Sequence, residues 1–221
     1  MQKFDTPTPI STVLTVPAGR VRFIAADRAD TAVEVLPADP TKSRDVRAAE
    51  QTAVTYADGV LRIDAPGPAK EYVGPVGALE VTVQLPVDSR VEVEAATAEL
   101  RGVGRLGDVA FVGAHRRIKL DEAASVHLTA IDGDVEIGRL NGSAEITTAR
   151  GDIRITEAAR GTLVLDTQYG DITVGAAVGV SAALKAHAGH GRIDNALKND
   201  GSVQLDIQAT TPHGDITARS L

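Results

Sequence analysis

Three histidines and an aspartate near the end of the chain are the residue types of a metal site. His187, His190, His213 and Asp215 are close in sequence, and imidazole nitrogens and carboxylate oxygens are ligands that Zn²⁺ takes in proteins. In the repeat register described below, we expect His190 to lie between Asp171 and Asp215. Exposed turn histidines are the commoner origin of such a cluster. We therefore expect no resident metal, with these four residues as the candidate ligands.

Four aspartates that directly follow a glycine form a second set, because equal spacing would align their carboxylates along one corner. Such a row could bind Ca²⁺, which prefers hard oxygen ligands. The calcium-binding nonapeptide repeat needs Gly-Gly-x-Gly-x-Asp, and this spacing does not occur in the sequence. Turn capping by the aspartate side chain is therefore the preferred interpretation. The four residues are Asp134, Asp152, Asp171 and Asp215.

Catalytic and cofactor motifs have little support. The string GVGRLG at 102–107 has glycines at dinucleotide-binding spacing, but the strand-like DVAFV follows it where a helix would be needed. The chain has no Cys and no G-x-S-x-G. Enzymes built on parallel β-helices commonly stack sugars on aromatic side chains, and this sequence has only three Tyr, three Phe and no Trp. We expect no catalytic residue, no cofactor and no enzymatic activity.

The composition narrows the classes of partner. The chain of 221 residues has a net charge of −7 and a pI near 5.2, which disfavours phosphate-backbone binding. No apolar run approaches the ~20 residues that cross a bilayer. The start, MQKFDTPTPI, lacks the basic and apolar regions of a secretory signal. We expect a cytoplasmic protein without nucleic-acid partners or membrane insertion.

These side chains lie on a repeat of 18 to 19 residues, counted from Gly133 to Gly151 to Gly170. Each unit has an alternating apolar pair, a turn ending in Gly-Asp and a second alternating pair. The pattern decays in both directions: a unit reading AHAGHGRI places His190 at the Asp position, and the last unit restores the motif with Gly214-Asp215. Period-2 alternation predicts short strands with one buried face.

Equal unit length predicts an all-β fold in which each unit is one coil of a right-handed parallel β-solenoid with 18–19 residues per coil. A meander of antiparallel hairpins is the alternative. We expect eight residues of the apolar pairs to point inward, and the turn glycines Gly133, Gly151 and Gly170 to have positive φ. The eight are Val135, Ile137, Ile153, Ile155, Leu163, Leu165, Ile172 and Val174. In such a stack the outward residues form a column of Lys119, Glu136, Arg154, Thr173, Arg192 and Thr217.

The first ninety residues do not repeat. Six strand-like segments are expected at 10–16, 20–25, 31–37, 52–56, 60–66 and 78–86, with a hairpin at Asp58-Gly59, a helical turn or two within 39–51 and a proline-bearing loop at 65–77. An open solenoid end exposes unpaired backbone. We interpret residues 1–88 as an N-terminal β cap and residues 89–221 as the solenoid, in one continuous domain rather than two.

The sequence resembles the bacterial DUF4097 adhesin family. The resemblance lies in the repeats GDVEI, GDIRI, GDITV and GDITA, and extends to AGRVRFIAADRADTAVEVLPADP and LPVDSRV, as in its actinobacterial branch. It implies a β-strand-repeat fold and, in some members, a link to envelope stress or surface adhesion. It implies no catalytic residue.

The predicted function is that of a non-enzymatic β-repeat scaffold with protein partners. The alternatives are a surface adhesin or ligand-binding protein, and a carbohydrate-active β-helix enzyme. No plug follows the last repeat, so its coil should present a free edge. We expect homo-association through this coil, as a closed dimer. The interface residues would be Val203, Leu205 and Ile207.

Overall fold

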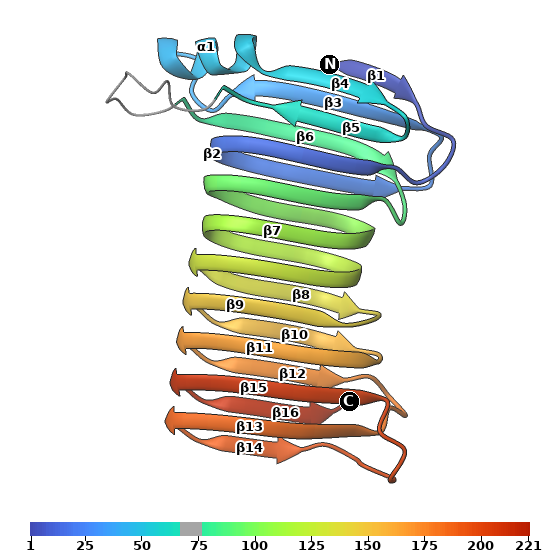
Figure 1. Cartoon of the computed structure of the whole chain (residues 1–221), viewed down its shortest axis with the longest axis vertical. Helices are drawn as coiled ribbons and strands as arrows, with labels where there is room; N and C mark the ends of the chain where they lie inside the picture. Colours follow the sequence, from blue (N-terminus) through green and yellow to red (C-terminus); the bar gives the residue numbers. More distant parts are fainter. Residues whose placement is uncertain (67–76) are drawn as a thin grey trace.

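The computed structural model describes residues 1–66 and 77–221, with the backbone alone for residues 114–116. Most of the loop expected at 65–77, including Pro68 and Pro75, lies outside the described residues. The strands join into one sheet of sixteen strands, wound into a tall stack with two broad faces (Figure 1). This confirms the predicted all-β solenoid with parallel coils.

Each coil in the middle of the stack contributes one strand to each face. The back face contains β8 (Asp134–Leu140), β10 (Ile153–Ala158) and β12 (Ile172–Ala176), and the front face contains β9 (Ala144–Arg150) and β11 (Gly161–Tyr169). The long β7 (Arg90–Asp132) winds through the coils before them (Figure 1). All pairings among these strands are parallel.

The apolar residues stack in register inside the coils. Ile153 pairs with Val135 on one side and Ile172 on the other, and Ile155 follows with Ile137 and Val174. All eight residues predicted to face inward are buried. Alternation along each strand therefore places one row of apolar side chains in the core and the other row in solvent.

The coils do not stack in the order of the chain. β15 (Leu205–His213) lies between β11 and β13 (Ala182–His190), and β16 (Ile216–Ser220) lies between β12 and β14 (Ile193–Ala196). The chain thus skips one level, forms the β13/β14 coil, and returns to fill the gap (Figure 1). The prediction that the last repeat ends the stack is wrong, because coils of equal shape can stack in an order that differs from the sequence.

The N-terminal residues close the other end. β2 (Ser11–Ala26) makes a first coil that pairs in parallel with β7, β5 (Val60–Asp64) and β6 (Leu79–Pro86). Antiparallel strands then extend both faces of the stack. β3 (Asp30–Pro37) pairs with β6 and is followed by β1 (Gln2–Asp5), and β4 (Ala53–Ala57) pairs with β5.

Two local predictions for this cap are confirmed. The helix α1 (Ser43–Gln51) lies at the top of the stack (Figure 1), within the segment expected to be helical. Asp58 and Gly59 join β4 to β5 with φ of 50° and 76°, the backbone of a tight hairpin turn. One hydrophobic core extends from the cap to β16. The division near residue 88 stays a prediction.

Candidate functional site

The corner that carries the Gly-Asp turns is the most regular polar feature of the stack. Gly133, Gly151 and Gly170 have φ of 120°, 134° and 154°, which confirms the predicted positive values. A Cβ on Gly151 would lie 2.1 Å from the carbonyl oxygen of Gly133, and one on Gly170 would lie 2.1 Å from that of Gly151. The coils therefore approach so closely at this corner that no side chain fits.

The aspartates of these turns form a ladder of hydrogen bonds from coil to coil. The backbone N–H of Asp152 donates to Asp134 Oδ1 at 3.0 Å, that of Asp171 to Asp152 Oδ1 at 2.8 Å, and that of Asp215 to Asp171 Oδ1 at 2.7 Å. Each carboxylate thus caps the next turn. This confirms the turn-capping interpretation.

Arg192 ends the ladder. Its backbone N–H donates to Asp215 Oδ1 at 2.8 Å and its guanidinium Nη2 to Asp215 Oδ2 at 2.9 Å. These contacts, the backbone bond first, hold the pKa of Asp215 below its usual value. The prediction that His190 lies between Asp171 and Asp215 is wrong. Asp215 lies between Asp171 and Arg192, because β16 is inserted before β14.

The residues directly before the turn glycines form a second column, which includes stacked rings. Tyr169 pairs with His213 in register, and His213 with His190. The Tyr169 and His213 ring centroids are 4.8 Å apart with planes 3° from parallel, and those of His213 and His190 are 4.9 Å apart at 11°. Tyr169 is 55% exposed and both histidines are exposed. Toward the N-terminal cap the column continues from Tyr169 to Arg150, whose Nη2 lies 3.6 Å from Asp132 Oδ2.

The candidate metal ligands do not converge. His190 and His213 lie face to face, and His187 pairs with Thr210 at another level of β13. Asp215 is engaged by Arg192. Among the side chains that the structure describes, those of residues 1–66, 77–113 and 117–221, no group of three or more His, Cys, Asp or Glu is arranged to hold a metal ion.

Sequence reasoning missed a buried ladder of threonines beside the turns. Thr148, Thr167 and Thr211 are buried. The Thr167 and Thr211 hydroxyls donate to the carbonyls of Gly151 and Gly170, each at 3.0 Å. The signal was available in the sequence, because each of these threonines lies three positions before the glycine of its Gly-Asp turn. The corresponding residue of the β13/β14 coil is Ala188, so the ladder ends there.

The β13/β14 coil is the open end of the stack. Among the described residues, β13 pairs only with β15, and β14 only with β16. Leu184, Ala186 and Ala188 of β13 are half-buried, and Ile193 of β14 is 47% exposed although it pairs with the buried Ile216. We call the β13/β14 coil the open end.

The predicted interface residues do not form this edge. Leu205 and Ile207 are fully buried between β11 and β13, so the prediction of a free edge at these residues is wrong. Val203 precedes β15 and is 47% exposed. The physical reason is the insertion of the last coil, which gives it a neighbour on both sides.

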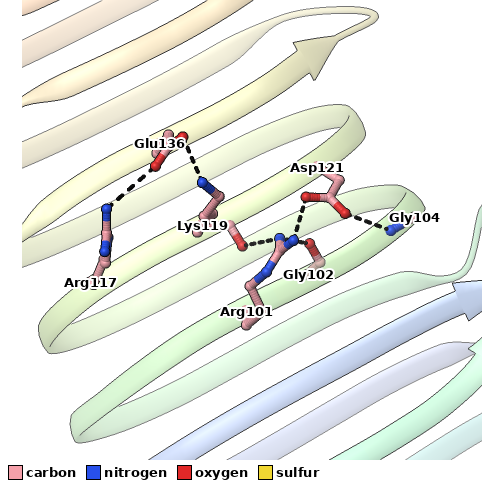
Figure 2. A network of polar contacts seen from close by, with 7 residues as sticks. All are labelled: Arg101, Gly102, Gly104, Arg117, Lys119, Asp121 and Glu136. Carbon is pink, nitrogen blue, oxygen red and sulfur yellow. Dashed lines mark hydrogen bonds and ion pairs between the residues drawn. The ribbon is translucent and has the colours of Figure 1, made fainter.

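A network of charges covers part of the back face (Figure 2). Arg101 Nη2 contacts Asp121 Oδ1 at 2.5 Å, and the other oxygen of Asp121 accepts the N–H of Gly104 at 3.2 Å. Lys119 Nζ lies 2.8 Å from Glu136 Oε1. This hydrogen bond is the largest cause of the lowered pKa of Glu136.

The predicted column of outward residues is confirmed from Lys119 through Glu136 to Arg154, whose charges alternate in sign. Beyond Arg154 the column continues through Thr173 and Thr217 to Asp194, rather than through Arg192. Lys119 and Glu136 form an ion pair between neighbouring coils, and exposed pairs of this kind contribute little stability.

The glycine-rich string at 102–107 lies inside β7, with strand on both sides, so it lacks the helix N-terminus of a dinucleotide site. In the part of the chain that the structure describes, no helix has the length and apolar character to cross a membrane.

Comparison with known proteins identifies the fold. A "putative adhesin" from Bacteroides fragilis aligns with a TM-score of 0.54 at 15% identity, over 98% of this chain and 95% of that one. A "putative lipid binding protein" from Parabacteroides distasonis aligns with a TM-score of 0.53 at 12% identity and the same coverage. No protein of curated function matches the sequence. The Toastrack DUF4097 family model matches residues 11–220, so the chain belongs to the DUF4097 family.

Proposed function

We propose that the protein is a non-enzymatic scaffold that associates through its open end with a second copy of the same chain. The observation that carries the proposal is the one-sided pairing of β13 and β14. A strand with a single neighbour presents unpaired N–H and C=O groups, which another strand can bind. Both strands of the open end have this property, so one docking event would satisfy two edges.

The side chains of the open end support the same contact. The interior of the last coil is only partly covered at Leu184 and Ile193. A second open end placed against it would remove this apolar surface from water. Burial of apolar surface contributes about 25 cal/mol per Å². Strand addition would therefore be accompanied by a hydrophobic gain.

The opposite end of the stack favours a closed dimer over a filament. At that end α1 lies over the cap (Figure 1), and the outermost strands β1 and β4 are antiparallel to their neighbours. A second copy that added its open end there would meet the helix. Two open ends can instead meet by a two-fold rotation, which uses the same surface on both chains.

The corner chemistry supports a role without catalysis. The Gly-Asp carboxylates Asp134, Asp152 and Asp171 each accept a backbone N–H from the next coil. The rings of His190 and His213 stack on each other. These groups are used to hold coils together, which is the task of a structural column.

The mass of the protein in solution at micromolar concentration tests the proposal. We expect a dimer for the unmodified chain and a monomer for Ile193→Lys, because an inward charge blocks an edge. Val112→Lys is the matched control: Val112 is 52% exposed on β7, in the middle of the stack, and its variant should stay dimeric. An unmodified chain that sediments as a monomer would contradict the proposal, as would equal masses for the two variants.

A surface adhesin or ligand-binding protein is the second candidate. It is supported by the descriptions of the two matched structures and by the exposed rings of Tyr169, His213 and His190, which form a flat row on the corner. Fractionation of the native cells separates the two candidates. Recovery in the extracellular or envelope fraction favours the adhesin, and recovery in the cytoplasm favours the scaffold.

A further inference from the structure

The slot between β11/β12 and β13/β14 is the most unusual feature of the stack. It is occupied by β15 and β16, which come later in the chain than all four strands that form its walls. The open end has no other strand neighbours among the described residues. The insert, residues 203–221, therefore holds the open end onto the rest of the stack.

The apolar side chains of the insert form part of the hydrophobic core inside the slot. Leu205, Ile207 and Ile216 are buried, with Thr211 bonded to the carbonyl of Gly170 and Asp215 to the turn of Arg192. An empty slot would expose two pairs of strand edges and this apolar interior to water. The slot is consequently stable only when a segment with the same pattern of residues occupies it.

The connection between the open end and the insert is exposed. Residues 198–204 are all exposed, and a Cβ on Gly201 would meet nothing within 4 Å. Several hydrogen bonds hold this loop, and all of them would have to open for exchange. They include Asp200 N–H to Ser181 Oγ at 3.1 Å, Lys198 N–H to Ser220 Oγ at 2.9 Å and Gln204 N–H to the Ser181 carbonyl at 2.9 Å. Extended, the eight residues 197–204 reach roughly 26 Å. The loop can therefore lead either back into its own slot or across to another molecule.

We propose that two copies of the chain exchange their inserts when they refold together, so that residues 203–221 of each copy occupy the slot of the other. The exchanged and unexchanged forms have the same contacts in the slot and differ only in the path of residues 197–204. Exchange of an identical element is a route to dimers with little cost in free energy. The partner is a second copy because its insert already has the side chains that the slot accepts. This dimer is independent of the contact between open ends.

Disulfide trapping tests the exchange, since the chain has no native Cys. Val164 of β11 and Gln208 of β15 are exposed register partners on adjacent parallel strands, within the Cα separation that a disulfide spans. Chains with V164C and differently tagged chains with Q208C are refolded together and oxidised. We expect a disulfide between the two tags, because exchange places residue 208 of one copy beside residue 164 of the other.

Controls separate exchange from collision and from the open-end contact. Val112→Cys refolded with Q208C should give no such bond. The V164C and Q208C pair with Ile193→Lys added to both chains should still form it, since that substitution blocks only the open end. The double variant V164C/Q208C in one chain reports that the cysteines can bond within a slot. Formation of this internal bond without any bond between tagged chains would overturn the proposal.

Discussion

Replacement of Gly151 by Ala is the most direct test of the corner geometry. Gly151 has a φ of 134°, and an added Cβ would lie 2.1 Å from the Gly133 carbonyl oxygen and 2.5 Å from its carbon. The neighbour is backbone in a hydrogen-bonded coil, so it cannot rotate away as a side chain would. The substitution must either separate two coils or distort the turn.

The magnitude follows from two contributions. A residue with a side chain at this φ costs about 1–3 kcal/mol in backbone strain. Insertion of a group into packed structure costs about another 1–3 kcal/mol. We expect Gly151→Ala to lower the free energy of unfolding by about 4 kcal/mol. For a chain of this size that corresponds to roughly 8–16 °C in melting temperature.

Urea denaturation and thermal melting followed by circular dichroism measure this loss of stability. Two control variants separate its backbone-strain contribution from its steric-overlap contribution. Gly201 has a φ of 97° with nothing within 4 Å, so Gly201→Ala reports strain alone. A Cβ on Gly175, whose φ is not in the left-handed region, would lie 2.2 Å from the Thr156 carbonyl oxygen, so Gly175→Ala reports overlap alone. A Gly151→Ala protein no less stable than the Gly201→Ala protein would refute the close approach of the coils.

Three further predictions concern the core, the ladder and metals. Ile153→Ala should lower the free energy of unfolding, measured in urea, by about 2–4 kcal/mol, because a stacked interior cannot collapse around the gap. A loss smaller than that from replacing an exposed Val by Ala would contradict this prediction. The pKa of Asp215 is lower in the folded protein than its ordinary 3.8, so its contribution is complete above that pH and is lost as the pH falls below it. Asp215→Asn should therefore flatten the acid limb of stability against pH, and an unchanged limb would count against the ladder. A chelator should leave the melting temperature unchanged, and a loss of several degrees would instead identify as metal ligands His187, His190, His213 and Asp215.

Much of the corner could be predicted from residue types alone. Alternating apolar residues, such as Ile153 and Ile155, indicate which side of a strand is buried, because side chains alternate across a strand. Glycine at positive φ and aspartate as a turn cap are local chemistry within a few residues. The threonine ladder had an equally local signal in the constant offset of Thr148 and Thr167 from their turn glycines.

The neighbours of Asp215 and the burial of Ile207 could not be predicted in the same way. Both depend on which coil lies beside which, and coils with similar edges can pair in more than one order. The β13/β14 unit differs from its neighbours in having Ala188 for Thr and Arg192 for Asp. These differences suit a coil with a neighbour on one side only. They could have indicated an end coil, but only if the order of stacking had been treated as open.

The amino-acid sequence by itself determined the strands, their buried faces and the Gly-Asp corner, because these depend on residues close together along the chain. The tertiary structure decided the order of the last two coils. That order places Asp215 against Arg192, buries Leu205 and Ile207, and leaves the edge of β13 and β14 open. The physical reason is that pairing between coils is a long-range choice, set by the burial and hydrogen bonds of the whole stack rather than by the pattern of any one repeat.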